Sequence, residues 1–352
     1  MRNRRLVGVL AGVAALVAGC GSGGSSSVSS AVVTDHVHAA VEAATPAGIM
    51  LATHYGLLTS RDAGRSWQTD TGLGYDMVGA LLHVHGTYVA ATLPDRSATT
   101  PSWESASAAP VQVSTDGRTW SAAHGIPAGS TVTSLVPGDG RTVWASVLGS
   151  GVYRSDDEGK HWAIAIPAAL PITALAAVGD NLVLAAGAGV FVTGTTSPSM
   201  PALPQLDATV DDLEVSPRCD GCLVATLAHG GVATSRNGGV TWARHPFHIT
   251  FESVAAPADF PGVLIGTSPS PSRRNEGLWR STDDGVHWSR VLSEPLIDHV
   301  YDVPATGSRK SALLAFQWGI QVYRSSDGGR TWQRMSRAGG VPAGAAMAAT
   351  PY

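Results

Sequence analysis

Short apolar stretches separated by polar turns run through most of the chain. Stretches at 172–175, 182–186 and 189–193 are rich in Val, Ile, Leu and Ala, and Gly, Asn and Asp lie between them. Such segments are typical of β-strands joined by tight turns. No long segment has the spacing of an amphipathic helix. The pattern therefore predicts an all-β chain.

A polar pattern, Ser-x-Asp-x-Gly-x-x-Trp, recurs six times after an apolar strand; one copy is a residue shorter, and one has Asn in place of Asp. An Asp side chain accepts hydrogen bonds from backbone N–H groups further along a turn, Gly supplies a positive φ, and Trp anchors the hairpin in the core. We interpret these residues as structural, with calcium binding or catalysis by the Asp residues as the alternative. They are Asp62, Trp67, Asp116, Trp120, Asp157, Trp162, Asn237, Trp242, Asp283, Trp288, Asp327 and Trp332.

The repeated pattern resembles the Asp-box, or bacterial neuraminidase repeat, of sialidases, sortilin-like receptors, some glucanases and photosystem II assembly factors. In those families it marks a hairpin at the periphery of a β-propeller blade, away from any active site. The resemblance implies a fold and does not imply sialidase activity.

The spacing of the six Trp residues predicts seven units. The gap between Trp162 and Trp242 is nearly twice the others, and we expect it to hold a further blade whose motif has decayed into the Thr195–Pro204 stretch. We predict a single seven-bladed β-propeller of four-stranded antiparallel blades over residues 34–352. The apolar stretch 341–350 is a candidate to pair with the first blade and close the ring.

The N-terminal residues have the features of an export signal. A basic start is followed by a short apolar run, and the run ends at Val17-Ala18-Gly19-Cys20, which resembles a lipobox. We predict a lipoprotein signal peptide over 1–19, acylation of Cys20, and a flexible Gly/Ser tether over 20–33. An ordinary secreted protein and an uncleaved anchor are the alternatives.

Charge and cysteine content narrow the partners. Without Arg2, Arg4 and Arg5 the chain has 20 basic and 27 acidic residues, a formal net charge of −7, which argues against nucleic acid. We expect a monomer attached to the outer face of the membrane by its lipid anchor. Outside the cytoplasm Cys219 and Cys222 are expected to form a disulfide, with a metal pair or a redox site as alternatives.

The sequence favours a non-catalytic protein over an enzyme. A sialidase clamps its substrate with three Arg residues from different blades, yet there is no Arg in the segments expected to form the innermost strands. These segments are 36–42, 76–83, 131–136, 172–177, 210–215, 250–255 and 298–303. A glycoside hydrolase that uses two carboxylates remains the alternative, because acids recur where these strands begin. These acids are Asp35, Asp76, Asp211, Asp212, Glu252, Asp298 and Asp302.

One face of the expected propeller gathers long loops and histidines. The loops 94–110 and 268–276 lie on the face where the innermost strands begin, and rigidly held loops often bind ligands. Imidazole and thioether groups there suit copper or zinc, although they are also compatible with ordinary packing. We predict a channel-mouth site for a protein or glycan ligand, with no cofactor other than a possible metal held by His36, His38, His54 and His299. Its residues are His36, His38, His54, Asp76, Met77, Asp211, Asp212, Glu252, Asp298 and His299.

The first two blades carry a narrower resemblance. His36-Val37-His38, followed by Ala52-Thr53-His54, is similar to a group of exported bacterial glycosylhydrolase-like lipoproteins. Relatives carry Gly-His-Pro after the second blade's second strand, whereas this chain has Thr92-Leu93-Pro94. The departure puts in doubt whether the relatives' site is retained.

Overall fold

The chain forms a seven-bladed β-propeller, as the repeat predicts. The computed structural model describes residues 37–43, 48–54, 56–62, 64, 66–70, 72–74, 77–93, 109–269, 274–303, 312–317 and 321–335. Within these ranges there are seven antiparallel sheets of four strands and no helix, and hence no helix that could span a membrane. The predicted signal peptide and tether, residues 1–33, lie outside the described residues.

Each blade is one contiguous stretch of chain whose strands pair in sequence order. Blade 1 consists of β1 (Val37–Ala43), β2 (Gly48–Thr53), β3 (Gly56–Ser60) and β4 (Gln68–Asp70), blade 2 of β5 (Met77–Val84), β6 (Thr87–Leu93), β7 (Val111–Ser114) and β8 (Ser121–Ala122), and blade 3 of β9 (Val132–Pro137), β10 (Val143–Val147), β11 (Gly151–Ser155) and β12 (Ala163–Pro167). Blade 4 consists of β13 (Ile172–Val178), β14 (Asn181–Ala186), β15 (Gly189–Gly194) and β16 (Leu206–Asp207), and blade 5 of β17 (Val210–Val215), β18 (Leu223–Leu227), β19 (Val232–Ser235) and β20 (Ala243–His245). Blade 6 consists of β21 (Ser253–Ala255), β22 (Leu264–Ser268), β23 (Gly277–Ser281) and β24 (Ser289–Leu292), and blade 7 of β25 (Ile297–Val303), β26 (Ala312–Gln317), β27 (Gln321–Ser325) and β28 (Gln333–Arg334).

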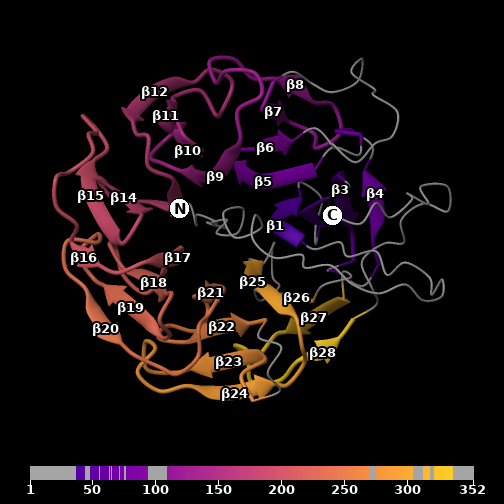
Figure 1. Ribbon diagram of the computed structural model, residues 1–352. Helices are drawn as coiled ribbons and strands as arrows, with labels where there is room; N and C mark the ends of the chain where they lie inside the picture. Colours follow the sequence, from indigo (N-terminus) through magenta and orange to yellow (C-terminus); the bar gives the residue numbers. More distant parts are fainter. Residues whose placement is uncertain are drawn as a thin grey trace, which may run out of the picture.

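The blades form a ring in which the first strand of each blade lies innermost (Figure 1). Blade 7 closes the ring against blade 1, because one apolar cluster joins Val37 and Leu51 of blade 1 to Leu314 and Phe316 of blade 7. Residues 341–350, the candidate closing segment, lie outside the described residues.

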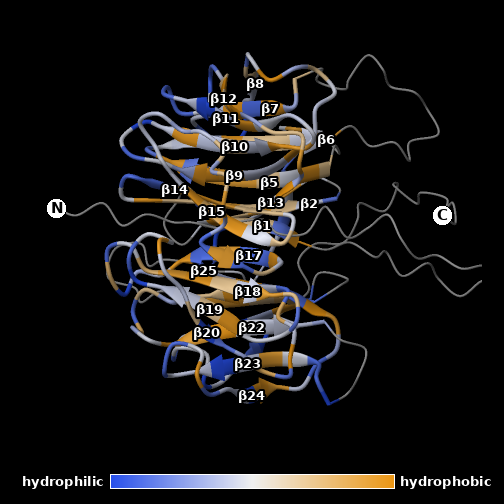
Figure 2. Cartoon of the chain, turned by 60° about the vertical axis from the view of Figure 1, so that its left-hand side comes forward, coloured by the Kyte–Doolittle hydropathy of each residue, from blue (hydrophilic) through white to orange (hydrophobic). Residues whose placement is uncertain are grey.

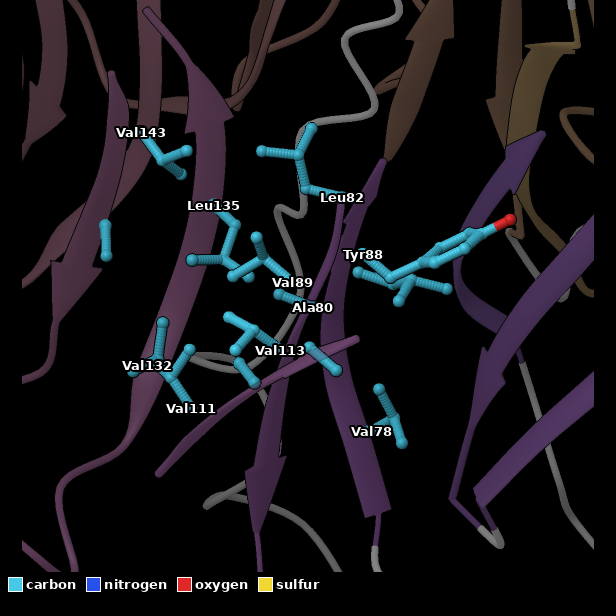
Figure 3. Packing of buried hydrophobic residues seen from close by; sticks show 14 of the residues in the cluster. Val78, Ala80, Leu82, Tyr88, Val89, Val111, Val113, Val132, Leu135 and Val143 are labelled. Carbon is cyan, nitrogen blue, oxygen red and sulfur yellow. The ribbon is translucent and has the colours of Figure 1, made fainter. Parts of the chain in front are cut away.

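The core consists of apolar layers between successive blades. Figure 2 shows hydrophobic strands throughout the wheel and many hydrophilic turns and loops at its edges. Figure 3 shows one such layer, where Val89 and Val111 of blade 2 and Val132 and Leu135 of blade 3 belong to a single buried cluster. Removing this apolar area from water is the main stabilising term, so each blade depends on its neighbours.

In each of the six repeated turns, side-chain oxygens accept hydrogen bonds from backbone N–H groups of the same turn. In every copy the Ser Oγ accepts a hydrogen bond from the Gly N–H at 2.8–2.9 Å. The Asp or Asn Oδ1 accepts one from the N–H of the residue before the Trp at 2.7–3.0 Å. Burial alone would raise the pKa of Asp327, but hydrogen bonds from Thr331, Ser325 and Arg330 lower that pKa to about 2. These contacts support a structural role for the turns.

The turn between β17 and β18 is crosslinked. A disulfide joins Cys219 to Cys222, with 5.3 Å between their Cα atoms. The structure thus has the bond that the sequence analysis favours over a metal pair or a redox site.

Candidate functional site

Six of the seven innermost strands have a β-bulge near their beginning, and β21 does not. In β1, β5, β9, β13, β17 and β25 the pairing with the second strand shifts by one residue close to the strand's start. A bulge redirects side chains and interrupts the alternation of a strand. His38 and Asp298 lie at bulges, and so do Asp211 and Asp212 together. Side-chain directions at these positions therefore cannot be read from a simple period of two.

Polar residues from three neighbouring blades meet along the innermost strands. Asp212, Asp298, His299 and Tyr301 have exposed fractions of only 3%, 1%, 4% and 6%, whereas Asp211 and Glu252 are partly exposed. We call this group the inner-strand cluster. Its members are Asp211, Asp212 and Glu214 on β17, Glu252 just before β21, and Asp298, His299, Tyr301 and Asp302 on β25.

Two carboxylates of the cluster bond to the backbone of blade 6. The Val254 N–H donates to Asp212 Oδ2 at 3.1 Å, and the Ala258 N–H donates to Asp302 Oδ2 at 2.9 Å. The Val254 bond satisfies an N–H on β21, an edge strand of its sheet. The second oxygens, Asp212 Oδ1 and Asp302 Oδ1, are buried and have no hydrogen-bond partner.

His299 lies between these acids and carries the positive charge of the cluster. Its Nδ1 is 3.5 Å from Asp298 Oδ2, its Nε2 has no hydrogen-bond partner, and its ring is nearly parallel to that of Tyr301, with ring centroids 6.0 Å apart. The Tyr301 hydroxyl is also buried without a partner. A buried polar group without a partner is unfavourable, so the cluster has unsatisfied donors as well as acceptors.

Burial and mutual repulsion shift the pKa values of these groups. Burial raises the pKa of Asp212 to about 7 and that of Asp302 to about 6. Burial, with Asp212 and Asp302 nearby, holds the pKa of Glu214 well above its usual range. Burial alone would lower the pKa of His299, but Asp298, Glu252 and Asp212 raise that pKa to about 9. At neutral pH the cluster therefore combines a cationic imidazole with carboxyl groups that retain part of their protons.

Of the other five predicted site residues, three belong to the described part of the chain and two do not. His38 on β1 and His54 after β2 touch edge to face, with ring centroids 4.6 Å apart, and Met77 lies half-buried at the start of β5. His36 and Asp76 lie outside the described residues, so the four-histidine metal site stays a prediction. Among the described residues no group of three or more His, Cys, Asp or Glu is arranged to hold a metal ion.

The sequence analysis missed Tyr301 and Glu214. Each lies two residues after a predicted site residue on the same inner strand, after His299 and Asp212 respectively. Because residues two apart share a face of a regular strand, the period of two could have found Tyr301 from His299. Asp212 lies at a bulge, so the same argument does not extend to Glu214.

Comparisons with known proteins identify the fold and not the family. Neither protein-family models nor curated proteins match the chain. Among solved structures it is similar to one described as YCF48 bound to D1 peptide, with 16% identity, a TM-score of 0.56 and coverage of 88% of this chain and 94% of that one. It is also similar to the extracellular domain of the putative one component system BT4673 from B. thetaiotaomicron, with 12% identity, a TM-score of 0.59 and coverage of 83% of this chain and 38% of that one. At such identities the likeness establishes the β-propeller fold alone.

Proposed function

We propose that this chain is an exported, lipid-anchored binding or assembly module that holds a positively charged group of a protein ligand at the inner-strand cluster. The rigid ring supports this role, because binding sites are commonly held by such scaffolds. A fold neighbour is described as bound to a peptide, which makes a protein ligand a reasonable class. Export and acylation at Cys20 rest on the sequence of residues 1–20.

The observation that carries the proposal is the excess of acceptors in the cluster. The cluster has six carboxyl groups and one imidazole, three of the carboxyl groups act directly on that imidazole, and Asp212 Oδ1 and Asp302 Oδ1 are buried without a donor. An ammonium or guanidinium group supplies donors and offsets the repulsion among the acids. Asp211 and Glu252 are partly exposed, so they form the accessible edge at which a ligand would enter.

Peptide binding tests this proposal. Calorimetry would compare three peptides that differ only in a central Lys, norleucine or Glu. We expect the Lys peptide to bind best, and Asp212→Asn to weaken it about tenfold because a charge-assisted hydrogen bond is lost. Asp180→Asn changes the net charge equally at an exposed turn and should leave binding unchanged. Equal affinity for all three peptides would contradict the proposal.

A glycoside hydrolase is the second candidate. It is favoured by Asp212 and Glu252, whose pKa values are raised by burial, since a general acid must keep its proton near neutral pH. A panel of chromogenic glycosides separates the two functions. If the chain hydrolyses a glycoside and Glu252→Gln abolishes this hydrolysis, the hydrolase becomes the better-supported function. If no glycoside is hydrolysed, the binding module remains the better-supported function.

The lipid anchor and the metal site need their own measurements. Mass spectrometry of the N-terminal peptide would detect acyl chains on Cys20, and Cys20→Ala should release the protein from membranes. Elemental analysis of purified protein would test for copper or zinc. The metal hypothesis rests on the histidines that the sequence places near the channel mouth, of which His38 and His54 are neighbours, and a result without metal would count against it.

A further inference from the structure

Each repeated turn packs its glycine against the preceding blade. A Cβ atom added to Gly159 would lie 2.9 Å from Val89 of blade 2, and one added to Gly329 would lie 2.3 Å from Ile265 of blade 6. A Cβ on Gly117, Gly239 or Gly285 would likewise lie within 3.0 Å of a side chain of the blade before it, whereas one on Gly64 would make only ordinary contacts. At five of the six turns the glycine therefore fills the outer part of the junction between blades, where a side chain would collide with the neighbouring blade.

The turn of blade 4 is two residues longer than that of blade 3 and has lost its chemistry: Val190 pairs with Leu206, whereas the equivalent Val152 pairs with Ile166. Leu182 pairs with Thr193 as Leu223 pairs with Ser235, so Thr193 occupies the Ser position. The motif then places Thr195 at the Asp position, Ser197 at the Gly position and Met200 at the Trp position. The Thr193 Oγ1 accepts from the N–H of Ser199, two residues later than in the other full-length turns, and Ser197 does not adopt the positive φ of the turn glycines.

A pocket of about 150 Å³ lies at this junction, between blades 3 and 4. Its lining includes Trp144, Arg154, Asp139 and Thr195. A water molecule occupies about 30 Å³ in the liquid, and few voids in protein interiors are larger than one water molecule. The pocket is therefore larger than an ordinary packing defect. The altered turn thus coincides with an open pocket at the place that a turn glycine occupies in the other blades.

Trp144 presents an unsatisfied donor at this pocket. Trp144 pairs with Arg154 in blade 3 as Val89 pairs with Val113 in blade 2. Trp144 therefore occupies the position of Val89, the aliphatic residue that lies against the turn glycine of the following blade. It is 1% exposed, and its Nε1–H has no hydrogen-bond partner. The Arg154 guanidinium carbon lies 5.4 Å from the ring centroid, and its Nη1 donates to the Thr195 carbonyl. None of the described residues places an acceptor within hydrogen-bond distance of the indole N–H.

We propose that this pocket is a second binding site, for a glycine-containing turn of a peptide or protein partner. The bound turn replaces the one that blade 4 lacks, its glycine approaches the wall closely, and a backbone carbonyl accepts the Trp144 Nε1–H. In four of the chain's own turns the glycine carbonyl accepts the indole Nε1–H of the Trp that ends the same turn, so this carbonyl is an acceptor of the kind that Trp144 needs. The site is separate from the inner-strand cluster.

The test uses the full chain and a cyclised peptide with the sequence of residues 321–334, which carries the blade 7 turn. We expect saturable binding and a shift of the Trp144 indole N–H resonance, assigned with Trp144→Phe. A control peptide with Val in place of the turn's second Gly should not bind, because its side chain would meet the pocket wall. Trp144→Phe should weaken binding about tenfold through the lost hydrogen bond.

A rebuilt turn provides the decisive variant. Thr195→Asp, Ser197→Gly and Met200→Trp, combined with deletion of two residues from 201–204, should restore the motif at its usual length, fill the pocket and abolish peptide binding while raising the melting temperature. If this variant fails to fold, Trp144→Phe decides. Asp212→Asn should leave this binding unchanged, which separates the site from the cluster. Absence of binding by the unmodified chain, or equal binding by Trp144→Phe, would overturn the proposal.

Discussion

Replacing Asp212 with Asn should remove much of the pH dependence of stability above about pH 5. Burial raises the pKa of Asp212 from 3.8 to about 7, so the folded state holds this proton more tightly than the unfolded chain. The resulting stability is complete below the unfolded value of 3.8 and is lost as pH rises through about 7. The amide of the Asp212→Asn variant has no such proton and keeps a carbonyl for the Val254 N–H.

The size of the effect follows from linkage. At about 1.4 kcal/mol for each pH unit between folded and unfolded values, Asp212 accounts for roughly 4 kcal/mol in total. About 2–3 kcal/mol of this falls between pH 5 and pH 8. The turn aspartates act in the opposite direction. Their stability is lost only as pH falls through about 2, so they do not disturb this window.

Urea unfolding at a series of pH values, followed by Trp fluorescence, measures this dependence. The free energy of unfolding of the natural chain should fall with rising pH, and between pH 5 and pH 8 that of Asp212→Asn should fall by about 2–3 kcal/mol less. A fall due to Asp302 and Glu214, whose pKa values burial also raises, should remain in the variant. Asp180→Asn, which changes an exposed turn residue, should follow the natural chain. Parallel profiles for Asp212→Asn and the natural chain would refute the reasoning.

Three further predictions use the same unfolding assay. Asp327→Ala should destabilise the chain by about 1–2 kcal/mol because the turn loses its acceptors, whereas Asp327→Asn should lose less than about 1 kcal/mol because Asn237 makes the equivalent bond in blade 5. Gly159→Ala should lower the free energy of unfolding by about 2–4 kcal/mol, because the added methyl group overlaps Val89 and the residue has a φ of 87°. Gly74→Ala, which has open space around it, should lower it by only about 1 kcal/mol. Similar losses for the two variants would contradict the packing argument. His299→Gln should remove the fall in stability expected as pH rises through about 9, and an unchanged alkaline limb would show that the imidazole is not charged.

Strand positions were largely predictable because they depend on local chemistry. The sequence places the innermost strands of blades 4 and 5 at 172–177 and 210–215, and the structure has them at Ile172–Val178 and Val210–Val215. Blade 6 differs most, since its inner strand is only Ser253–Ala255 whereas 250–255 was expected. Glu252 consequently lies just before the strand.

Convergence of the site was only partly predictable. The sequence shows acids where several inner strands begin, but it does not show which of these acids come together, because that depends on how the blades are arranged in the ring. The structure brings those of blades 5, 6 and 7 together around His299 and adds Tyr301. It also shows a bulge at His38, so simple alternation does not fix which side of β1 this residue occupies.

The sequence by itself determined the number of blades, the approximate strands and the repeated turns, because glycine φ, side-chain capping and a period of two act within a few residues. Only the tertiary structure decided which buried acids share a site and that the altered turn of blade 4 adjoins a pocket over Trp144. Both depend on distances between residues far apart in the chain, and ring closure and packing between blades set those distances.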